Sequence, residues 1–270
     1  MDNPVFGFIG TGHMGGALAR AAAKTLPPER LLLSNRTPAK AEALAAELGC
    51  RAATVEETAG CSTYLFLGVK PQGLRGLAEQ LVPVLSRRRD RFVLVSMAAG
   101  VTIDQLRMLF NADYPVARIC PNTPAAVGKG LVGWCSRGVN SAEMDELCTS
   151  MRAAGLWDEL PEEKMDICSV LGGSTPAFAY MFIEALADGA VRCGLPRSKA
   201  TQYAALAVEG AASLLLQSGE HPGALKDAVC SPSGCTIVGV NTLEEHAFRA
   251  GVMDAVYTAV ERAAVMAKGK

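Results

Sequence analysis

The sequence has no excess of either charge. Lys and Arg number 26 against 27 Asp and Glu in 270 residues, a formal net charge of −1 at pH 7. A nucleic-acid-binding surface needs a basic excess, so the balance argues against a nucleic-acid partner. Charged residues make up only 20% of the chain and hydrophobic residues 50%, which excludes a largely disordered protein. The length suffices for two domains.

The chain also lacks signals for a membrane or for export. No apolar run reaches the roughly 18 residues of a membrane span without a charge or a Gly/Pro break. The opening MDNPVFGFIG carries Asp2 in place of a basic cluster, so we expect no signal peptide. The nine cysteines are an odd number and form no C-x-x-C pair. These features predict reduced thiols in a cytoplasmic protein, with no membrane partner.

What the first half does contain is an alternation of short apolar runs and helical stretches. The apolar runs, which we interpret as strands, are 5–9, 30–35, 62–69, 91–97 and 115–120. A helix is predicted over 37–49, with Thr37 as N-cap, Pro38 at the first helical position and Gly49 past the end. Strands that alternate with helices predict right-handed βαβ units. We therefore expect an α/β fold with a parallel, doubly wound sheet.

A glycine triplet follows the first predicted strand and opens a helix. Gly10 permits a tight turn, Gly12 lets a pyrophosphate approach the backbone, and Gly15 lets the helix pack closely on the strand. The free N–H groups at the helix start would face the phosphates. Because the triplet occurs in this context, it predicts a Rossmann-type dinucleotide site that also includes Thr11, His13 and Met14.

The end of the second predicted strand indicates which dinucleotide binds. An NAD-preferring site usually has Asp or Glu there to hold the ribose 2′-OH. This chain has Ser34, Asn35 and Arg36 instead. The Arg36 guanidinium can pair with a 2′-phosphate. We therefore predict a preference for NADP over NAD, although Arg36 could also be only a solvated loop charge.

Later strand ends carry small residues and prolines, which suit a flat floor beneath a nicotinamide and its ribose. Ligands of doubly wound sheets bind at the carboxyl ends of strands. The prolines alone could simply terminate strands. The three segments are 69–71, 97–100 and 121–124. The predicted cofactor residues in them are Val69, Lys70, Pro71, Ala98, Ala99 and Asn122.

The second half is predicted to be all helical. An acidic, Pro-containing stretch at 156–166 ends the strand pattern. We place a domain boundary there, with a dinucleotide-binding domain over 1–160 and a helical domain over 161–270. Helices are expected over 174–194, 198–219 and 242–268. Because these helices are apolar on more than one face, they must be buried on more than one side, which predicts a homo-oligomer.

The segment AVCSPSGCTI (228–237) allows three interpretations. Cys230 and Cys235 have no neighbouring Cys or His cluster, which argues against a metal site. A nucleophilic cysteine would need a nearby base. In the third interpretation, Pro232 and Gly234 shape the start of a helix whose N–H groups bind an anion. Such a helix start can also exist without any ligand.

Three runs together resemble the pyrroline-5-carboxylate reductase family. They are FIGTGHMG near the start, PNTPAAVGKG (121–130), and the long run from Gly194 to Ile237 that contains GEHPGALKDAVCSPSGCTI. The resemblance extends from residue 5 to about residue 263. It implies reduction of 1-pyrroline-5-carboxylate to L-proline with NAD(P)H, the last step of proline biosynthesis. It also implies a dimer built through the C-terminal helices, which in this family often assembles into decamers.

The resemblance further implies roles for the residues of the 228–237 segment. The substrate carboxylate would bind at Ser231, Ser233, Gly234, Cys235 and Thr236. Thr236 matches the threonine whose hydroxyl contacts the ring nitrogen in the family, and is the predicted catalytic residue. Two departures concern substrate fit: Thr175 replaces a glycine, and Ser233 replaces a glycine and restricts φ.

Two other functions are compatible with parts of this sequence. A β-hydroxyacid dehydrogenase would carry a catalytic lysine in a long helix of its second domain, but no lysine occurs between Lys164 and Lys199. A protein that senses NADP without catalysis would share the fold. The intact Ser231, Gly234 and Thr236 argue against that alternative.

Overall fold

The computed structural model describes residues 3–267 of the chain. Contacts divide it into two compact units. The first contains the residues up to Ser174 together with those from Val260 onward, and the second is Thr175–Ala259. Helix α7 (Met165–Arg192) is continuous across the division.

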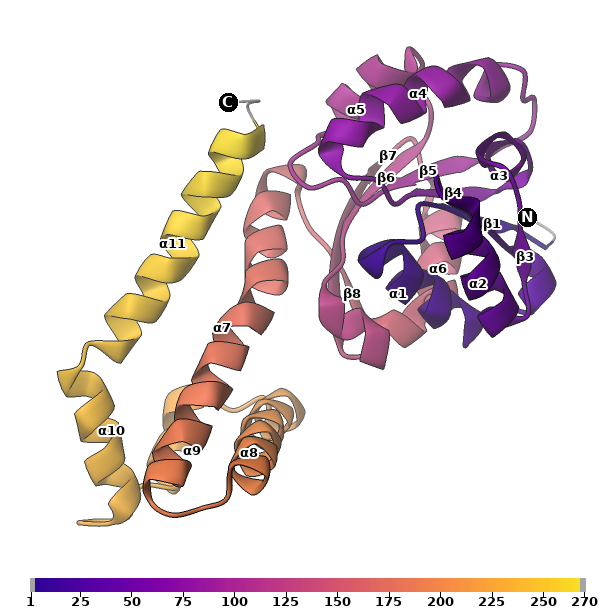
Figure 1. The fold of residues 1–270 in the computed structure, drawn as a ribbon. Helices are drawn as coiled ribbons and strands as arrows, with labels where there is room; N and C mark the ends of the chain where they lie inside the picture. The colour runs from indigo at the N-terminus through magenta and orange to yellow at the C-terminus, as the bar shows by residue number, and fades with distance from the viewer. Residues whose placement is uncertain (1–2, 268–270) are drawn as a thin grey trace. The chain divides into compact units, whose positions relative to one another are not determined.

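The first unit is built on an eight-stranded sheet with the order β3-β2-β1-β4-β5-β6-β7-β8 (Figure 1). The strands are β1 (Phe6–Ile9), β2 (Leu31–Ser34), β3 (Arg51–Ala52), β4 (Tyr64–Leu67), β5 (Val93–Ser96), β6 (Val116–Cys120), β7 (Gly130–Arg137) and β8 (Gly155–Glu159). Strands β1 to β6 are parallel, β7 is antiparallel to β6, and β8 is parallel to β7. The predicted parallel sheet is confirmed, and all five predicted strands are present. The sequence did not lead us to expect β3, β7 or β8.

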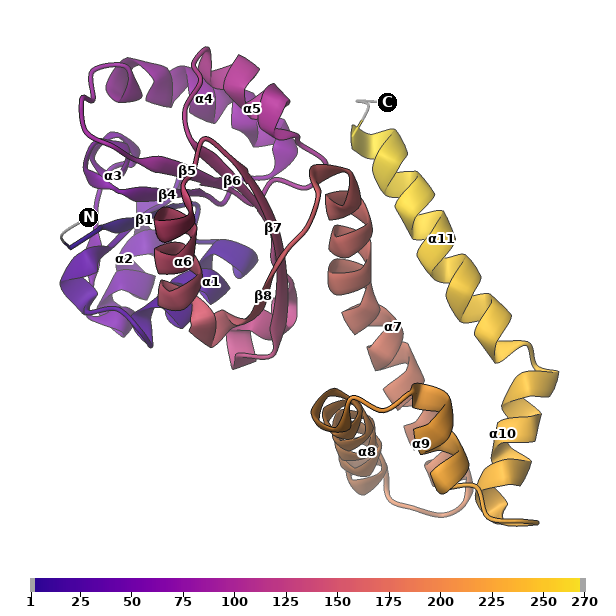
Figure 2. The same cartoon turned by 180° about the vertical axis from the view of Figure 1, so that it is seen from behind.

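Helices cover both faces of this sheet, as expected for a doubly wound fold (Figures 1 and 2). One core cluster joins the sheet to α1 (His13–Ala23), α2 (Pro38–Leu48) and α6 (Ser141–Ser150). The other joins it to α3 (Val55–Cys61), α4 (Pro71–Leu85) and α5 (Ile103–Phe110). Aromatic pairs strengthen the first cluster, since the rings of Phe8 and Phe66 stack with centroids 4.3 Å apart.

Local signals set several helix boundaries. Helix α2 begins after Thr37 and ends at Gly49, whose φ of 68° is the left-handed value that favours glycine. These bounds confirm the prediction, although the Thr37 side chain forms no capping hydrogen bond. Helix α5 begins with a capping box, in which Thr102 and Gln105 each accept a hydrogen bond from the other's backbone N–H.

The first two turns of α7 pack against one face of β6. Alternate residues of the chain point to the same side of a sheet, and three of them contact α7. Arg118 pairs with Asp166, the Cys120 thiol donates to the Met165 carbonyl at 3.6 Å, and Asn122, just past the strand, donates to the Gly172 carbonyl at 3.0 Å. This row of side chains fixes the start of α7 on the sheet.

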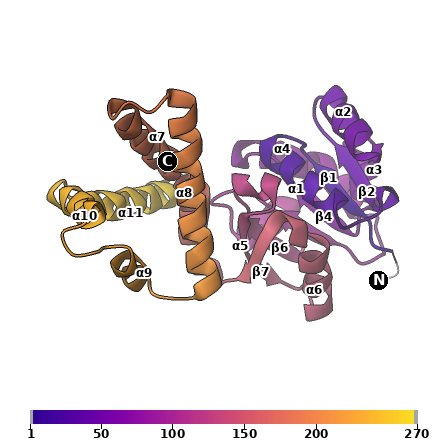
Figure 3. The same ribbon diagram turned by 90° about the horizontal axis from the view of Figure 1, so that it is seen from below.

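The remaining elements are helical, as predicted. They are α8 (Arg197–Ser218), α9 (Pro222–Ala228), α10 (Cys235–Glu245) and α11 (Phe248–Ala267) (Figure 3). In the second unit, α7 and α8 share a small cluster around Ala187, Ala200 and Ala204, and the ring centroids of Phe182 and Phe248 lie 5.8 Å apart.

Two predicted helix boundaries were wrong. Helix α7 begins at Met165 rather than at 174, because its helical geometry continues through Gly172 and Gly173. The stretch 242–268 holds two helices instead of one. Helix α10 ends at Glu245 with His246 as its C-cap, and the positive φ of 54° at Ala247 interrupts the helical geometry before α11.

The helices of the second unit expose much apolar surface in the single chain. Leu216 is 85% exposed, and Tyr180, Met181, Leu206, Val238 and Met253 are also exposed. The helical segment 162–192, which contains α7, is long and apolar enough to cross a membrane by length and composition alone. The core helix of a soluble protein passes the same test, so the expectation of no membrane span stays a prediction. Apolar faces of this size indicate surfaces that associate with another chain.

Candidate active site

The carboxyl ends of the parallel strands meet at one edge of the sheet. In the register, Ile9 at the end of β1 lies beside Ser34 of β2 and Leu67 of β4, and Leu67 lies beside Ser96 of β5. The strand order reverses between β1 and β4, and such a switch point is where open α/β sheets bind their ligands. The structure therefore brings the four predicted cofactor segments of these strands to one edge.

The glycine loop has the geometry that a dinucleotide requires. Gly10 has a φ of 97°, and its N–H donates to the Ser34 carbonyl at 2.8 Å. A Cβ at Gly15 would lie 2.0 Å from the Gly10 carbonyl oxygen, whereas one at Gly12 would meet nothing within 4 Å. Gly15 thus packs against protein while Gly12 faces open space, where a pyrophosphate can approach.

The start of α1 is chemically suited to phosphates. His13 is the first residue of the helix, and its N-cap Gly12 provides no side-chain cap, so the first N–H groups have no partner within the helix. The Thr11 hydroxyl oxygen is buried and has no hydrogen-bond partner among the described residues. An orphaned hydroxyl beside uncapped N–H groups fits a bound dinucleotide phosphate.

The residues after β2 have distinct positions. The Ser34 hydroxyl is fully buried and lies 3.5 Å from the Phe8 carbonyl oxygen, so only the Ser34 backbone supports the glycine loop. Asn35 accepts a hydrogen bond from the Thr11 N–H at 3.3 Å and so ties the two loops together. Arg36 is exposed, and no carboxylate occurs between residues 34 and 37. The edge near Arg36 is therefore open to an anionic group.

A depression of about 910 Å³ adjoins the ends of β4 and β5. Pro71, Gln72 and Arg75 of α4 line it, with Ala99 and Gly100 of the loop after β5 and Asp166 and Ser169 of α7. Lys70 is the exposed N-cap of α4, and Val69 precedes it. Ala98 is buried, and its N–H lies 3.4 Å from the Ser96 hydroxyl oxygen. Pro71 and Ala99 are thus the predicted cofactor residues that line a cavity.

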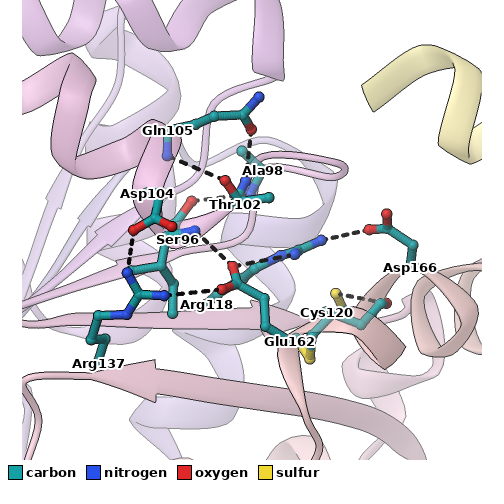
Figure 4. Close-up of polar contacts among 12 residues, drawn as sticks. Ser96, Ala98, Thr102, Asp104, Gln105, Arg118, Cys120, Arg137, Glu162 and Asp166 are labelled. Atoms are coloured by element: carbon teal, nitrogen blue, oxygen red, sulfur yellow. Dashed lines mark hydrogen bonds and ion pairs between the residues drawn. The ribbon is translucent and has the colours of Figure 1, made fainter. Parts of the chain in front are cut away.

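Arg118 forms a buried charge cluster that the sequence analysis missed (Figure 4). Its guanidinium is 3% exposed, donates to Asp166 at 2.6 Å and lies 3.6 Å from Glu162. Glu162 also accepts a hydrogen bond from the Ile103 N–H at 2.7 Å, which caps α5. The cluster thereby joins β6, the start of α5 and the start of α7. A charged residue within an apolar strand was the available signal, because buried charges need partners.

A second missed feature is the close approach of Gly10 and Gly68. A Cβ at Gly68 would lie 2.5 Å from the Gly10 carbonyl oxygen. The Gly68 N–H donates to the Ile9 carbonyl at 2.7 Å. A glycine directly after an apolar strand was the signal for this contact.

The predicted anion-binding segment forms a tight turn that leads into α10. The Gly234 N–H donates to the Ser231 carbonyl at 3.0 Å, so this N–H is already used within the turn. Those of Cys235 and Thr236, in the first turn of α10, have no helical partner. A Cβ at Gly234 would lie 2.3 Å from the Ser231 hydroxyl oxygen, which places that hydroxyl beside the helix start. Ser233 adopts a φ of 55°, a region that favours glycine.

The cysteines do not form a metal site or a disulfide in the structure. All nine are free thiols, and the described residues include no group of three Cys, His, Asp or Glu side chains that could hold a metal ion. Burial raises the pKa of Cys120 to about 12, so this thiol stays protonated and is a poor nucleophile.

Comparisons with known proteins extend this picture. A family described as pyrroline-5-carboxylate reductase dimerisation matches residues 162–266, and one described as NADP oxidoreductase coenzyme F420-dependent matches residues 5–100. The pyrroline-5-carboxylate reductase of Escherichia coli is 38% identical over 266 residues, covering 97% of this chain and 98% of that protein. That of Arabidopsis thaliana is 38% identical over 261 residues, covering 95% and 93%.

Solved structures agree with the sequence comparisons. Pyrroline carboxylate reductase of Plasmodium falciparum, with NADP bound, has a TM-score of 0.85 at 30% identity and covers 99% of both chains. The reductase of Coxiella burnetii has a TM-score of 0.89 at 27% identity, covering 97% of this chain and 98% of that one.

The doubly wound sheet, its glycine loop and the appended helices define a dinucleotide-binding oxidoreductase with a helical dimerisation domain. Within that class, the full-length similarity is specific. The chain belongs to the pyrroline-5-carboxylate reductase family.

Proposed function

We propose that the protein reduces 1-pyrroline-5-carboxylate to L-proline with NADPH, the last step of proline biosynthesis. The observation that carries this proposal is the similarity over nearly the whole chain to enzymes named pyrroline-5-carboxylate reductase. The segment from Ser231 to Thr236 adds support, because it places hydroxyl and N–H groups at the uncapped start of α10.

The cofactor is proposed to bind at the carboxyl edge of the sheet. The N–H groups at the start of α1 would hold the pyrophosphate, and the segments at 69–71 and 98–99 would border the nicotinamide end. Arg36 would pair with the 2′-phosphate and give the preference for NADP. A bound nicotinamide supplies the hydride.

The residues of the second half bind and polarise the substrate. The N–H groups of Cys235 and Thr236, with the Ser231 hydroxyl, would hold the carboxylate. The Thr236 hydroxyl would lie beside the ring nitrogen and stabilise its protonated form, because an iminium accepts hydride far better than a neutral imine. Holding the imine carbon in place supplies the rest of the rate enhancement.

The two proposed domains have different roles. Residues 1–160 bind the dinucleotide, and residues 161–270 bind the substrate and the partner subunit. The exposed apolar faces of the second half support self-association in a homodimer. We further propose that dimers assemble into a decamer and that the enzyme is cytoplasmic, since its thiols are free.

The direct test is an assay of the purified protein with NADPH and pyrroline-5-carboxylate, followed at the nicotinamide absorbance band. We expect substrate-dependent oxidation of NADPH with formation of proline, and rescue of a proline-requiring strain. NADPH binding without turnover would identify instead a protein that senses NADP and has lost its chemistry.

A further inference from the structure

Helix α7 continues through residues that normally interrupt a helix. Gly172, Gly173 and Pro176 all lie inside its 28 residues. Pro176 has no backbone N–H, and in a helix that N–H would bond to the carbonyl four residues earlier. The Gly172 carbonyl therefore loses its helical partner, and Gly172 is buried. A buried carbonyl without a partner is strongly destabilising.

The side chain of Asn122 supplies the missing donor. Its Nδ2 donates to the Gly172 carbonyl at 3.0 Å, and its Oδ1 accepts from the Leu131 N–H at 2.9 Å. A backbone carbonyl at one end and a backbone N–H at the other leave only one orientation for the amide. Asn122 is 7% exposed, so these bonds form away from water.

The amide is one of two side chains that support this part of α7. A Cβ added at Gly172 would lie 3.7 Å from the Asn122 Nδ2 and 3.8 Å from the Leu131 Cδ2. Of the two, only the amide can donate to the Gly172 carbonyl. Both ends of the side chain are engaged with protein backbone, so the amide has a structural role whether or not it also contacts the dinucleotide.

We propose that Asn122 is a positioning residue for imine reduction, whose amide replaces the N–H that Pro176 lacks and keeps α7 unbroken where the chain passes between its two units. This proposal rests on the proposed reductase activity. Hydride transfer requires the imine carbon to be held in a narrow range of positions. A helix that contains two adjacent glycines and a proline would bend without this bond, and the catalytic geometry would loosen.

The test is a double-mutant cycle between Asn122→Asp and Pro176→Ala, assayed with NADPH and pyrroline-5-carboxylate. Asp keeps the acceptor for Leu131 but directs a carboxylate at the Gly172 carbonyl. In the protein that retains Pro176, we expect Asn122→Asp to lower kcat about tenfold, while the Kd for NADPH changes less than about twofold. Pro176→Ala restores a backbone N–H that can itself donate to the Gly172 carbonyl, so in that background the fall should shrink to less than about threefold.

The chain offers a matched control in Pro83, an exposed proline inside α4. Pro83→Ala also removes a helical proline but leaves Gly172 untouched, so Asn122→Asp should lower kcat equally in its presence and absence. Thermal unfolding of the same variants gives a readout that does not depend on activity. It should show the same rescue by Pro176→Ala and none by Pro83→Ala. If Asn122→Asp does not yield folded protein alone, rescue of folding by Pro176→Ala is the expected result.

Two results would overturn the proposal. Equal losses with and without Pro176→Ala would show that Asn122 does not act through Gly172. A large rise in the Kd for NADPH, unaffected by Pro176→Ala, would make Asn122 a cofactor ligand instead. If the unsubstituted protein has no reductase activity, the proposed function is refuted. The thermal-unfolding measurements on the same variants would still decide whether the Asn122 amide replaces the proline N–H.

Discussion

The guanidinium of Arg118 lies 2.6 Å from the carboxylate of Asp166, and the two side chains differ sharply in exposure. Arg118 is 3% exposed and Asp166 34%. Removal of one partner from a buried pair leaves the other charge uncompensated. The consequence depends on which partner remains, because Asp166 can be hydrated by solvent and Arg118 cannot.

We therefore predict an asymmetry between two substitutions. Asp166→Ala removes the closer partner of a buried guanidinium, which is left with Glu162 at 3.6 Å, and should lower the free energy of unfolding by about 1 to 3 kcal/mol. Arg118→Met keeps most of the volume, leaves only partly exposed carboxylates, and should cost less. Chemical denaturation of both variants checks this. Equal losses, or a larger loss for Arg118→Met, would contradict the electrostatic explanation.

Thr236 is predicted to act in the chemical step. Thr236→Ala should lower kcat/KM for pyrroline-5-carboxylate by more than about tenfold, because the hydroxyl proposed to stabilise the protonated ring nitrogen is lost. Thr242→Ala on the same helix is the control. The Thr242 hydroxyl donates to the Val238 carbonyl at 3.2 Å and has no proposed role in catalysis. Unchanged steady-state kinetics in Thr236→Ala would remove the residue from the mechanism.

Arg36 is predicted to select the cofactor. Arg36→Ala should raise the KM for NADPH about tenfold and leave the KM for NADH nearly unchanged, since only NADPH carries the 2′-phosphate. Arg87→Ala, which removes another exposed arginine, controls for the change in net charge. An equal effect of Arg36→Ala on both cofactors would show that Arg36 does not bind the 2′-phosphate.

Ser233 is predicted to be strained. Its φ of 55° is costly for a residue with a Cβ, so Ser233→Gly should raise the free energy of unfolding by about 0.5 to 1 kcal/mol. Ser86→Gly is the matched control, because Ser86 has an ordinary helical φ of −64° and should lose stability. Thermal unfolding at equal protein concentration distinguishes the two. A loss of stability in Ser233→Gly would mean that the Ser233 side chain makes a compensating contact.

The pair of Arg91 and Glu143 predicts a pH dependence. Hydrogen bonds from Arg91, 2.7 and 2.8 Å long, lower the pKa of Glu143 below its usual value of 4.5. A carboxyl with a depressed folded-state pKa stabilises the protein above its unfolded pKa, and this stabilisation disappears as the pH falls through the folded pKa. Arg91→Gln should therefore reduce stability at pH 7, and the difference from the natural protein should shrink below about pH 4. A difference that stays constant between about pH 7 and about pH 3 would contradict this.

Much of the fold could be predicted because the strands that form the dinucleotide site are nearly continuous apolar runs. The runs at 62–69 and 91–97 gave β4 and β5 directly. Strand β7 could not be found in this way, since GLVGWCSR mixes glycine, polar and aromatic residues. Its direction depends on pairing with β6, which is a tertiary contact. The short β3 has only two residues and no pattern to detect.

The candidate site was predicted unevenly for a similar reason. The loop geometry requires glycine at positions 10 and 15, and glycine at 12 keeps open the space where a pyrophosphate can approach, so all three carry a local signal. The partners of Asn122 could not be predicted, since Leu131 and Gly172 are brought to it by the fold rather than by a local motif. The direction of the Ser34 side chain could not be predicted either, because its buried hydroxyl lies 3.5 Å from the Phe8 carbonyl oxygen of the neighbouring strand.

The second unit, Thr175–Ala259, has almost no hydrophobic core of its own. Among its described residues, only Ala187, Ala200 and Ala204 are buried apolar side chains in the single chain. These methyl groups and the partly buried side chains packed against them are too little apolar surface to offset the loss of chain entropy on ordering so many residues. The energy that keeps this half folded must therefore come from surfaces buried between subunits, and the midpoint of its unfolding will move with protein concentration.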